Sequence, residues 1–156
     1  MVPMFQDETL EITELPKRIA AFSSCFRREA GTYGKDTKGI IRVHQFDKIE
    51  MISFVKPNDD EEERKKLLDT AEDLLSALEL PYRIIRLARG DLSFPSAETI
   101  DIETWIPSQK KYRETHSIST TGDFQSRRLN IKYKNRTEKG FVHILNGTAF
   151  AIGRTL

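Results

Sequence analysis

Residues 25–50 read CFRREAGTYGKDTKGIIRVHQFDKIE, and they lie at the centre of two segments that together predict a β-hairpin. The first segment, IAAFSSCFRR over residues 19–28, is a run of small and aromatic residues typical of a strand, and the second, IIRVHQFDKIEMISFV over residues 40–55, alternates between polar and apolar positions. Between them, EAGTYGKDTKG carries three glycines and two lysines without apolar periodicity, which indicates a long hairpin loop. A loop of this length favours a functional role.

The two-residue period of the second strand sorts its side chains onto two faces. One face carries Arg42, His44, Phe46, Lys48 and Glu50. In the preceding strand Arg27 and Glu29 also share a face, so pairing of the two strands predicts a patch of arginines, carboxylates and an aromatic ring. Two interpretations remain open here, a binding surface or a solvated sheet face with weak cross-strand ion pairs.

The pattern after Pro57 changes from strand to helix and back. Asn58 is placed to cap a helix over about residues 59–79, which Pro81 ends. Its apolar stripe consists of Leu67, Leu68, Ala71, Leu74, Leu75 and Leu78. Strand-like runs follow at 82–88, 98–106, 112–120 and 141–145, with a helical turn or irregular segment within 123–133 and the start of a helix over 146–156. This order predicts an α+β fold with a mainly antiparallel sheet.

The composition excludes several classes of protein. With 25 basic and 24 acidic side chains among 156 residues, the chain lacks the overall basic excess of a non-specific nucleic-acid binder, so any such role is local. A single cysteine excludes an intramolecular disulfide, and no apolar run approaches the roughly 20 residues that cross a bilayer. No basic leader with an apolar run opens the chain, and we therefore expect a cytoplasmic protein without a membrane span.

The spelling of several segments resembles one enzyme family. Residues 25–50 resemble motif 2 of the class II aminoacyl-tRNA synthetases, in the form found in bacterial-type seryl-tRNA synthetases: an F-R-x-E strand, a long loop, then R-V-H-Q-F-x-K-x-E. IETWIPSQKKYRETHS over 102–117 resembles the strand and turn before the family's metal-carrying glutamate, DFQSRRLNI over 123–131 its next segment, and LNGTAFAIGRTL over 145–156 its motif 3. The resemblance runs from about Val2 to Leu156.

The resemblance implies a class II synthetase-like α+β fold, an antiparallel sheet flanked by helices, truncated at both ends. Residues 1–156 would form a single partial catalytic domain, with motif 2 at about 19–55, the amphipathic helix at about 59–79, the metal-binding strand at about 112–120 and motif 3 at about 144–156. The family's N-terminal coiled-coil arm, its motif 1 and its serine-binding T-x-E loop are expected to be absent from this chain.

The resemblance also implies an ATP site. Arg27 matches the catalytic arginine of motif 2 that holds the α-phosphate and the serine carboxylate, a task that suits a planar guanidinium. Arg154 matches the motif 3 arginine directed at the terminal phosphates. The implied ATP-binding residues are Arg27, Arg28, Glu29, Arg42, Val43, Phe46, Glu114, Thr115, His116, Ser117 and Arg154. Glu114 matches the carboxylate that holds Mg²⁺ against the phosphates, with Ser117 beside it, in keeping with that ion's preference for oxygen ligands.

Three further positions are implied to bind serine. Glu50 matches the carboxylate that receives the substrate ammonium group, and Asn146 and Thr148 lie where the family meets the serine side chain. The loop over residues 30–39 corresponds to the motif 2 loop that meets the acceptor end of tRNA(Ser). The parent family forms homodimers through motif 1.

The implied function is ATP-dependent activation of serine to seryl-adenylate and its transfer to tRNA(Ser), weakened in a shortened chain. Two alternatives stand beside it. The chain is either a catalytically inactive relative that binds nucleotide or the tRNA acceptor end, or a ligase that passes an amino acid to a carrier protein.

Overall fold

The strands β2 (Lys17–Phe26) and β3 (Gln45–Val55) pair as the expected hairpin in the computed structural model, which describes residues 1–29 and 40–156. The expected loop over residues 30–39 lies outside the described residues. Residues 40–44 were expected to be strand and are not, because this segment turns away from the sheet toward the C-terminal helix. The ladder still reaches one step further, since the backbone N–H of Arg27 donates to the carbonyl of His44 at 2.8 Å.

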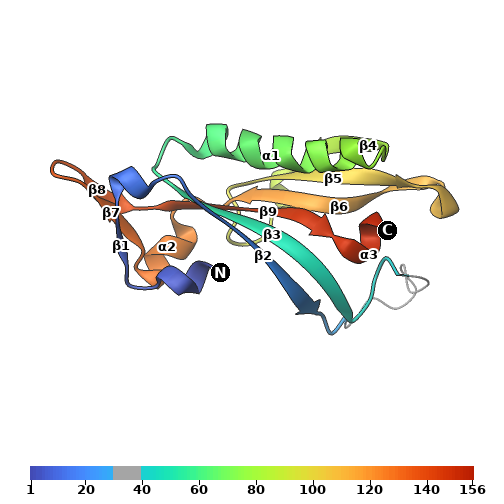
Figure 1. Cartoon of the computed structure of the whole chain (residues 1–156), viewed down its shortest axis with the longest axis horizontal. Helices are drawn as coiled ribbons and strands as arrows, with labels where there is room; N and C mark the ends of the chain where they lie inside the picture. The colour runs from blue at the N-terminus through green and yellow to red at the C-terminus, as the bar shows by residue number, and fades with distance from the viewer. Residues whose placement is uncertain (30–39) are drawn as a thin grey trace.

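Within the described chain, six strands form one antiparallel sheet in the order β2-β3-β9-β6-β5-β4. The other members are β4 (Tyr82–Arg86), β5 (Glu98–Ile106), β6 (Lys111–Thr120) and β9 (His143–Ala151). A smaller sheet of β1 (Thr9–Glu11), β7 (Lys132–Lys134) and β8 (Lys139–Phe141) lies at one end of the molecule, and α1 (Asp60–Ala77) runs along one face of the large sheet (Figure 1). The expected α+β fold is confirmed.

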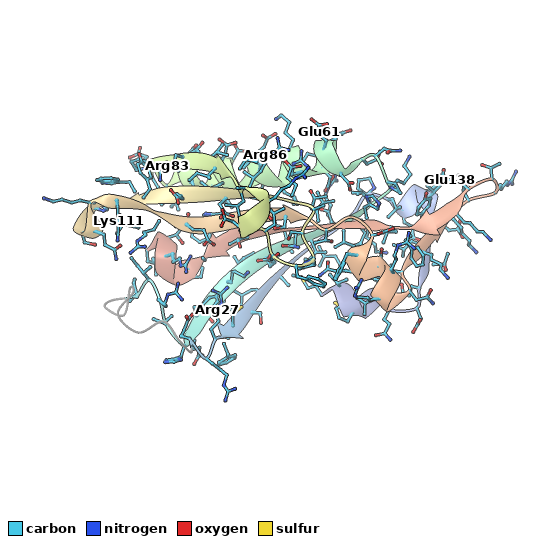
Figure 2. The ribbon with its side chains drawn as sticks, turned by 180° about the vertical axis from the view of Figure 1, so that it is seen from behind. Arg27, Glu61, Arg83, Arg86, Lys111 and Glu138 are labelled. Atoms are coloured by element: carbon cyan, nitrogen blue, oxygen red, sulfur yellow. The ribbon has the colours of Figure 1, made fainter. Side chains whose placement is uncertain are left out.

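Short helices complete the described part of the chain. They are η1 (Val2–Phe5), η2 (Ile12–Glu14), η3 (Arg89–Asp91), η4 (Pro107–Gln109), α2 (Phe124–Leu129) and α3 (Ile152–Thr155). Of the two alternatives for residues 123–133, a helical turn or an irregular segment, the helical turn is confirmed, because the segment contains α2 followed by the start of β7. Figure 2 shows charged side chains projecting outward: Arg83 and Arg86 from the edge strand β4, and Lys111 from the start of β6.

The amphipathic helix forms where its stripe predicts it, with shifted ends. The expected cap Asn58 has a left-handed φ of 78°, and Asp59 occupies the N-cap position instead, followed by four acidic residues in the first turn. These negative charges suit the partial positive charge of a helix N-terminus. The helix ends at Ala77, and Glu79 adopts a left-handed φ of 54° before Pro81. No helix in the described ranges is long and apolar enough to cross a membrane.

The expectation that a helix starts at Asn146 is wrong. Residues 143–151 form β9, which lies between β3 and β6, and only Ile152–Thr155 are helical. The partners of Asn146 in these ladders are Ile52 and Ser119. Pairing on both sides satisfies backbone groups that a helix would otherwise satisfy internally, so the central position in the sheet decides the conformation.

Two hydrophobic clusters hold these layers together. One packs the small sheet and N-terminal segment against β3 and β9, and its buried members are Val2, Leu10, Ile52, Phe54, Ile131, Tyr133, Val142 and Ile144. The other fills the interface of α1 with the large sheet and contains Val55, Leu67, Ala71, Leu75, Ile102, Ile118 and Leu145. The helix therefore covers one sheet face, and the expected polar side chains of β3 lie toward the other.

Candidate active site

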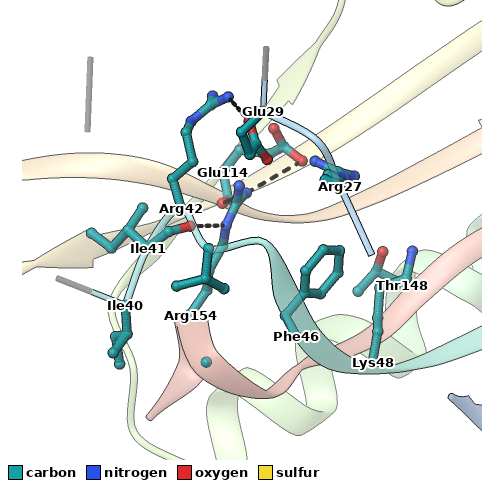
Figure 3. A pocket seen from close by; sticks show the side chains of 12 residues that line it. Arg27, Glu29, Ile40, Ile41, Arg42, Phe46, Lys48, Glu114, Thr148 and Arg154 are labelled. Carbon is teal, nitrogen blue, oxygen red and sulfur yellow. Dashed lines mark hydrogen bonds and ion pairs between the residues drawn. The ribbon is translucent and has the colours of Figure 1, made fainter. Parts of the chain in front are cut away.

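A pocket opens where the ends of β2, β3, β6 and β9 meet α3 (Figure 3). Its lining consists of Arg27, Glu29, Ile40, Ile41, Arg42, Val43, Phe46, Lys48, Glu114, Thr148, Gly153 and Arg154. These residues come from four stretches separated by long sequence intervals, and seven of them, from Arg27 to Arg154, were expected to bind ATP. Folding thus brings to one cavity the segments that resemble motifs 2 and 3 and the strand β6 between them.

Arg27 lies beside the ring of Phe46. Its guanidinium carbon is 5.2 Å from the ring centroid, a cation–π distance. Local backbone contacts hold Arg27 in place, because its N–H donates to the carbonyl of His44 and its own carbonyl lies 3.0 Å from Nδ1 of His44. His44 itself is exposed and does not line the pocket, so it contributes through its contacts with the backbone of Arg27.

Arg42 forms an ion pair with Glu29 across the ends of the hairpin. Nη1 of Arg42 donates to Oε2 of Glu29 at 2.7 Å, and only 14% of the Glu29 side chain is exposed. Both residues were expected from the sequence to lie in one patch of charged side chains and an aromatic ring. The pair places one cation and one anion at the pocket wall formed by the residues flanking 30–39.

Arg154 ties three segments together at the opposite wall. Its Nε donates to the carbonyl of Ile41 at 3.1 Å, and its Nη1 donates to the carbonyl of Glu114 at 2.7 Å. The same Nη1 lies 3.8 Å from the carboxylate of Glu114. The arginine of the last helix is thereby held against the pocket by β6 and by the segment that leads into β3.

The sequence placed Lys48 on the polar strand face with Phe46 and Glu50 but assigned it no binding role. Its Nζ lies 2.6 Å from Oε2 of Glu50, and the hydroxyl of Thr148 donates to the same oxygen at 3.4 Å. Glu50 is not part of the pocket lining, but Lys48 and Thr148 are. The alternation of polar and apolar residues along β3 is the sequence signal that could have identified Lys48 as a pocket residue.

A shift of strand register decides which residues of β6 face the site. Glu103 pairs with Glu114 and Ile102 with His116, so Thr115 between them has no ladder partner. The bulge leaves Glu114 exposed at the pocket, whereas Thr115 and His116 are both buried. A one-residue insertion in a ladder redirects the side chains that follow it.

The side chains of Thr115 and His116 are committed to internal hydrogen bonds and do not line the pocket. Nε2 of His116 lies 3.1 Å from the carbonyl of Ala149, which can only accept, and Nδ1 lies 2.9 Å from the Thr115 hydroxyl. Burial lowers the pKa of His116 and keeps the imidazole neutral, which fits this pattern of one donor and one acceptor. The structure brings neither side chain to the expected ATP site.

Three other expected residues also lie off the pocket lining. Arg28 is exposed beyond the end of β2, Asn146 is half-buried within β9, and Ser117 lies on β6 opposite Asp101. Ser117 donates a hydrogen bond to the Asp101 carboxyl. These positions surround the cavity without forming its wall.

Asp101 was missed by the sequence analysis and is electrostatically notable. Burial raises its pKa, and the nearby carboxylates of Glu114 and Glu103 raise it further, although the hydrogen bond from Ser117 opposes them. Its Oδ1 is buried without a hydrogen-bond partner among the described residues. In the described ranges no three His, Cys, Asp or Glu side chains converge closely enough to hold a metal ion by themselves.

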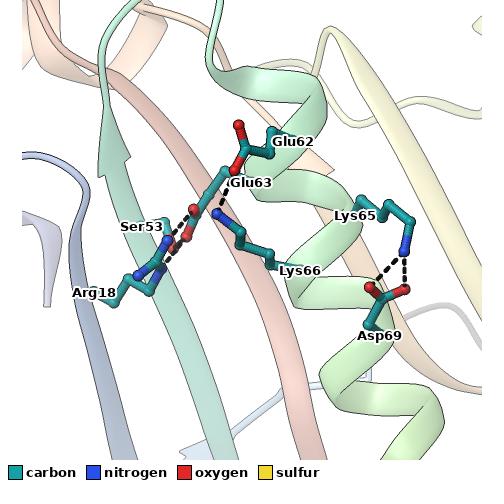
Figure 4. Close-up of polar contacts among 7 residues, drawn as sticks. All are labelled: Arg18, Ser53, Glu62, Glu63, Lys65, Lys66 and Asp69. Carbon is teal, nitrogen blue, oxygen red and sulfur yellow. Dashed lines mark hydrogen bonds and ion pairs between the residues drawn. The ribbon is translucent and has the colours of Figure 1, made fainter.

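The strands that carry the site are fastened to α1 by Glu63 (Figure 4). Its two carboxylate oxygens accept hydrogen bonds from Nε and Nη2 of Arg18 on β2 at 2.6 and 2.7 Å, and the Ser53 hydroxyl on β3 donates at 2.7 Å. The Glu63 side chain is 3% exposed. Burial alone would raise the pKa of Glu63, but the bonds from Arg18 and Ser53 outweigh it and leave the pKa below its usual value.

We expect Glu63→Gln to lower the free energy of unfolding by about 1.5–3 kcal/mol, because the buried acceptor of a charged hydrogen-bonding partner is lost. A carboxyl with a lowered pKa in the folded state contributes stability that is present above its unfolded pKa and lost as the pH falls through its folded pKa. The loss of unfolding free energy in the variant should therefore be largest at neutral pH and smallest in acid. Urea unfolding at several pH values measures both effects.

The matched control is Glu62→Gln, the neighbour whose exposed carboxylate pairs with Lys66 in the same helix. Exposed pairs of this kind contribute little, so this variant should unfold like the unaltered chain. Equal losses from both substitutions would contradict the role assigned to Glu63.

The fold and the site together define a class of protein. The whole chain, residues 1–156, matches the family model described as the tRNA synthetase class II core domain (G, H, P, S and T), and the protein belongs to that family. Within it, the chain is similar to proteins named serine–tRNA ligase. It is 50% identical over 153 residues to that of Sulfurimonas denitrificans, a match covering 98% of this chain and 37% of the relative, and 51% identical over 158 residues to that of Synechococcus elongatus, covering 100% and 37%.

Solved structures agree with these relatives. A crystal structure of seryl-tRNA synthetase from Pyrococcus horikoshii complexed with ATP superposes with a TM-score of 0.94 at 45% identity, covering 98% of this chain and 35% of that one. The cytoplasmic serine–tRNA ligase of Naegleria fowleri in complex with AMP gives a TM-score of 0.90 at 37% identity, covering 97% and 36%. The chain thus spans a little over a third of the length of these relatives.

Proposed function

We propose that this chain activates serine with ATP to form seryl-adenylate and that the same pocket transfers serine to the acceptor end of tRNA(Ser). The observation that carries the proposal is the meeting of Arg27, Phe46 and Arg154 in one cavity, built by the segments that resemble motifs 2 and 3. Similarity near 50% to serine–tRNA ligases supports the choice of amino acid.

The pocket suits a nucleotide. The ring of Phe46 offers a flat apolar surface for adenine, and Arg27 beside that ring places a guanidinium where the phosphates of a stacked nucleotide would begin. Arg154 supplies a second guanidinium at the far wall, already oriented by Ile41 and Glu114. The ATP bound to the Pyrococcus relative supports the same assignment here.

The chemistry needs positioning and charge neutralisation. One oxygen of the serine carboxylate attacks the α-phosphorus and forms a new P–O bond, while the bond from that phosphorus to the bridging oxygen breaks and its electron pair leaves with pyrophosphate. Preorganised cations aimed at the charge that develops on the phosphoryl oxygens lower the barrier of such a transfer. Arg27 and Arg154 would serve in this way.

Magnesium would be held by Glu114 and Ser117. The site fits a hard cation because Asp101, Glu103 and Glu114 interact through their negative charges and because Oδ1 of Asp101 is a buried oxygen without a partner among the described residues. Magnesium in such sites is held by one or two carboxylates together with substrate phosphates, so three converging protein ligands are not required. When bound, the ion would neutralise charge on the phosphates.

Serine would bind beside Glu50 and Thr148. Thr148 lines the pocket and its hydroxyl contacts the Glu50 carboxylate, so an ammonium group and a hydroxyl both find polar partners there. Asn146, the third residue implied by the family, is two residues before Thr148 on β9. Residues 30–39 would meet the tRNA, and a second copy of the parent protein would complete a homodimer.

Serine-dependent exchange of labelled pyrophosphate into ATP tests the proposal. We expect exchange that requires both serine and Mg²⁺, and that falls by about 10⁴-fold when alanine replaces serine, because a site that hydrogen-bonds a hydroxyl rejects the analogue lacking it. Calorimetry with ATP–Mg²⁺ accompanies the assay. Nucleotide binding without exchange would favour the binding-only alternative, since the chain spans a little over a third of its relatives' length. Absence of nucleotide binding would contradict serine activation and would leave binding of the tRNA acceptor end as the alternative function.

A further inference from the structure

Lys48 lies in the pocket and has no role in the function proposed so far. Its Nζ is 2.6 Å from Oε2 of Glu50, and the two side chains are 24% and 20% exposed. Figure 3 shows Lys48 beside Thr148, on the side of the pocket that also holds Phe46 and Arg27. The pair is thus more sheltered than the ion pairs of the outer helix face, such as Lys65 with Asp69, which are 72% and 47% exposed.

We propose that Lys48 and Glu50 together form a receptor for the zwitterionic end of the amino acid, with Glu50 taking the ammonium group and Lys48 taking the carboxylate. The inference rests on the proposed function, because it concerns the same amino-acid substrate. It assigns to Lys48 a contact with substrate that discriminates free amino acids from analogues without a carboxylate.

The first argument is one of charge. The Glu50 carboxylate is already neutralised by Lys48, so a substrate ammonium arriving there would place two cations around one anion. A substrate that also carries a carboxylate within a few ångströms of its ammonium removes this repulsion, because its own anion can contact Lys48. The four charges then alternate in sign around a closed ring, which is the favourable arrangement for two antiparallel ion pairs.

The second argument concerns hydrogen bonds. An ammonium group has three donors, so Lys48 can keep its bond to Glu50 and still donate to a second carboxylate. Glu50 is held as well, since the Thr148 hydroxyl contacts the same oxygen, Oε2, that accepts from Lys48. Because Lys48 and Thr148 both hold Oε2, the orientation of the whole Glu50 carboxylate is fixed, including its other oxygen, Oε1. A group that binds a ligand in one orientation needs to be held in this way.

The third argument is position relative to the nucleotide. Lys48 is two residues from Phe46 on β3 and therefore projects from the same face of the strand. A carboxylate held by Lys48 would lie close to Arg27, where the α-phosphate of a nucleotide stacked on Phe46 is expected. The lysine would also offset the repulsion between the attacking carboxylate and the phosphates.

The experiment compares L-serine with L-serinamide, in which a neutral amide replaces the carboxylate. Affinities are measured by calorimetry at pH 6.5, where the α-ammonium groups of both ligands are charged. The proteins are the unaltered chain, Lys48→Met, Lys48→Arg and the exposed control Lys65→Met, each first shown by thermal unfolding to be folded.

We expect the unaltered chain to prefer serine over serinamide by about 10-fold or more, the strength of one charge-assisted hydrogen bond. Lys48→Met should remove that preference by weakening serine alone, Lys48→Arg should keep part of it, and Lys65→Met should leave it intact. Equal weakening of both ligands would mean that Lys48 only supports Glu50, and tighter binding of both would mean that it only competes with substrate. Either result overturns the inference. Failure of the unaltered chain to bind either ligand would instead overturn the proposed function, and the inference with it.

Discussion

Replacing Arg27 with alanine is expected to lower serine-dependent pyrophosphate exchange by about 10²–10³-fold, the usual cost of removing one preorganised donor from a developing oxyanion. The Arg27 guanidinium lies 5.2 Å from the Phe46 centroid, and its backbone is bonded to His44 on both sides. Truncation leaves these backbone bonds in place. The fold should survive while the positive charge at the start of the phosphate path is lost.

The design separates charge from geometry. Arg27→Lys keeps the charge but loses the planar fork, so its exchange should lie between those of the alanine variant and the unaltered chain. Arg86→Ala is the matched control, an arginine whose side chain is 75% exposed and pairs with Glu98 away from the pocket. Figure 2 shows Arg86 and Arg27 at well-separated positions on the molecule. Exchange unaffected by Arg27→Ala would refute the assignment of this arginine and, with it, the proposed phosphate site.

Replacing Phe54 with alanine should lower the free energy of unfolding by about 3–5 kcal/mol, the largest stability effect expected here. Phe54 is completely buried on β3, in the cluster beneath the small sheet. The ring of Phe5 packs against it edge-on, with centroids 4.9 Å apart. Removal of the ring leaves a cavity between the N-terminal segment, β3 and β9. These three elements cannot all move inward to fill it.

Phe22→Ala provides the comparison on the paired strand. Phe22 lies on β2 and is 65% exposed, so its truncation should change the stability by about 0.5 kcal/mol or less. Urea unfolding followed by circular dichroism measures both variants. Similar losses for the two phenylalanines would show that Phe54 does not belong to the cooperative core.

Much of the fold could be predicted because its signals are local. The stripe from Leu67 to Leu75 identified α1, since residues three and four apart necessarily share a helix face. The alternation after residue 44 identified β3, and with it the neighbourhood of Phe46 and Glu50. The ends of these elements were less predictable, and Asp59 rather than Asn58 occupies the cap position of α1. A shift of one residue at a terminus costs too little energy for the local sequence to specify it.

The candidate site could be predicted only in part. Arg27, Arg42 and Arg154 line the pocket as expected, because their positions follow from motifs with fixed spacing. Thr115 and His116 do not, since the bulge beside Glu114 sends both side chains into the interior. Nothing within residues 112–120 alone reveals that insertion, which exists only through pairing with β5. Asp101 was missed for the same reason, because it lies opposite Ser117 on the neighbouring strand β6.

The sequence by itself determined the family, the α+β class, the long helix and three arginines that line the pocket, Arg27, Arg42 and Arg154. The tertiary structure decided where those residues lie: residues 146–151 form a central strand, Thr115 and His116 are buried, and Glu114 lines the pocket. The physical reason is that side-chain direction in a sheet depends on hydrogen-bond register with strands far away in sequence, and a shift of one residue reverses it. The periodicity of a helix can be recognised within one segment of sequence, whereas the register of a strand is defined only by its pairing with a second segment.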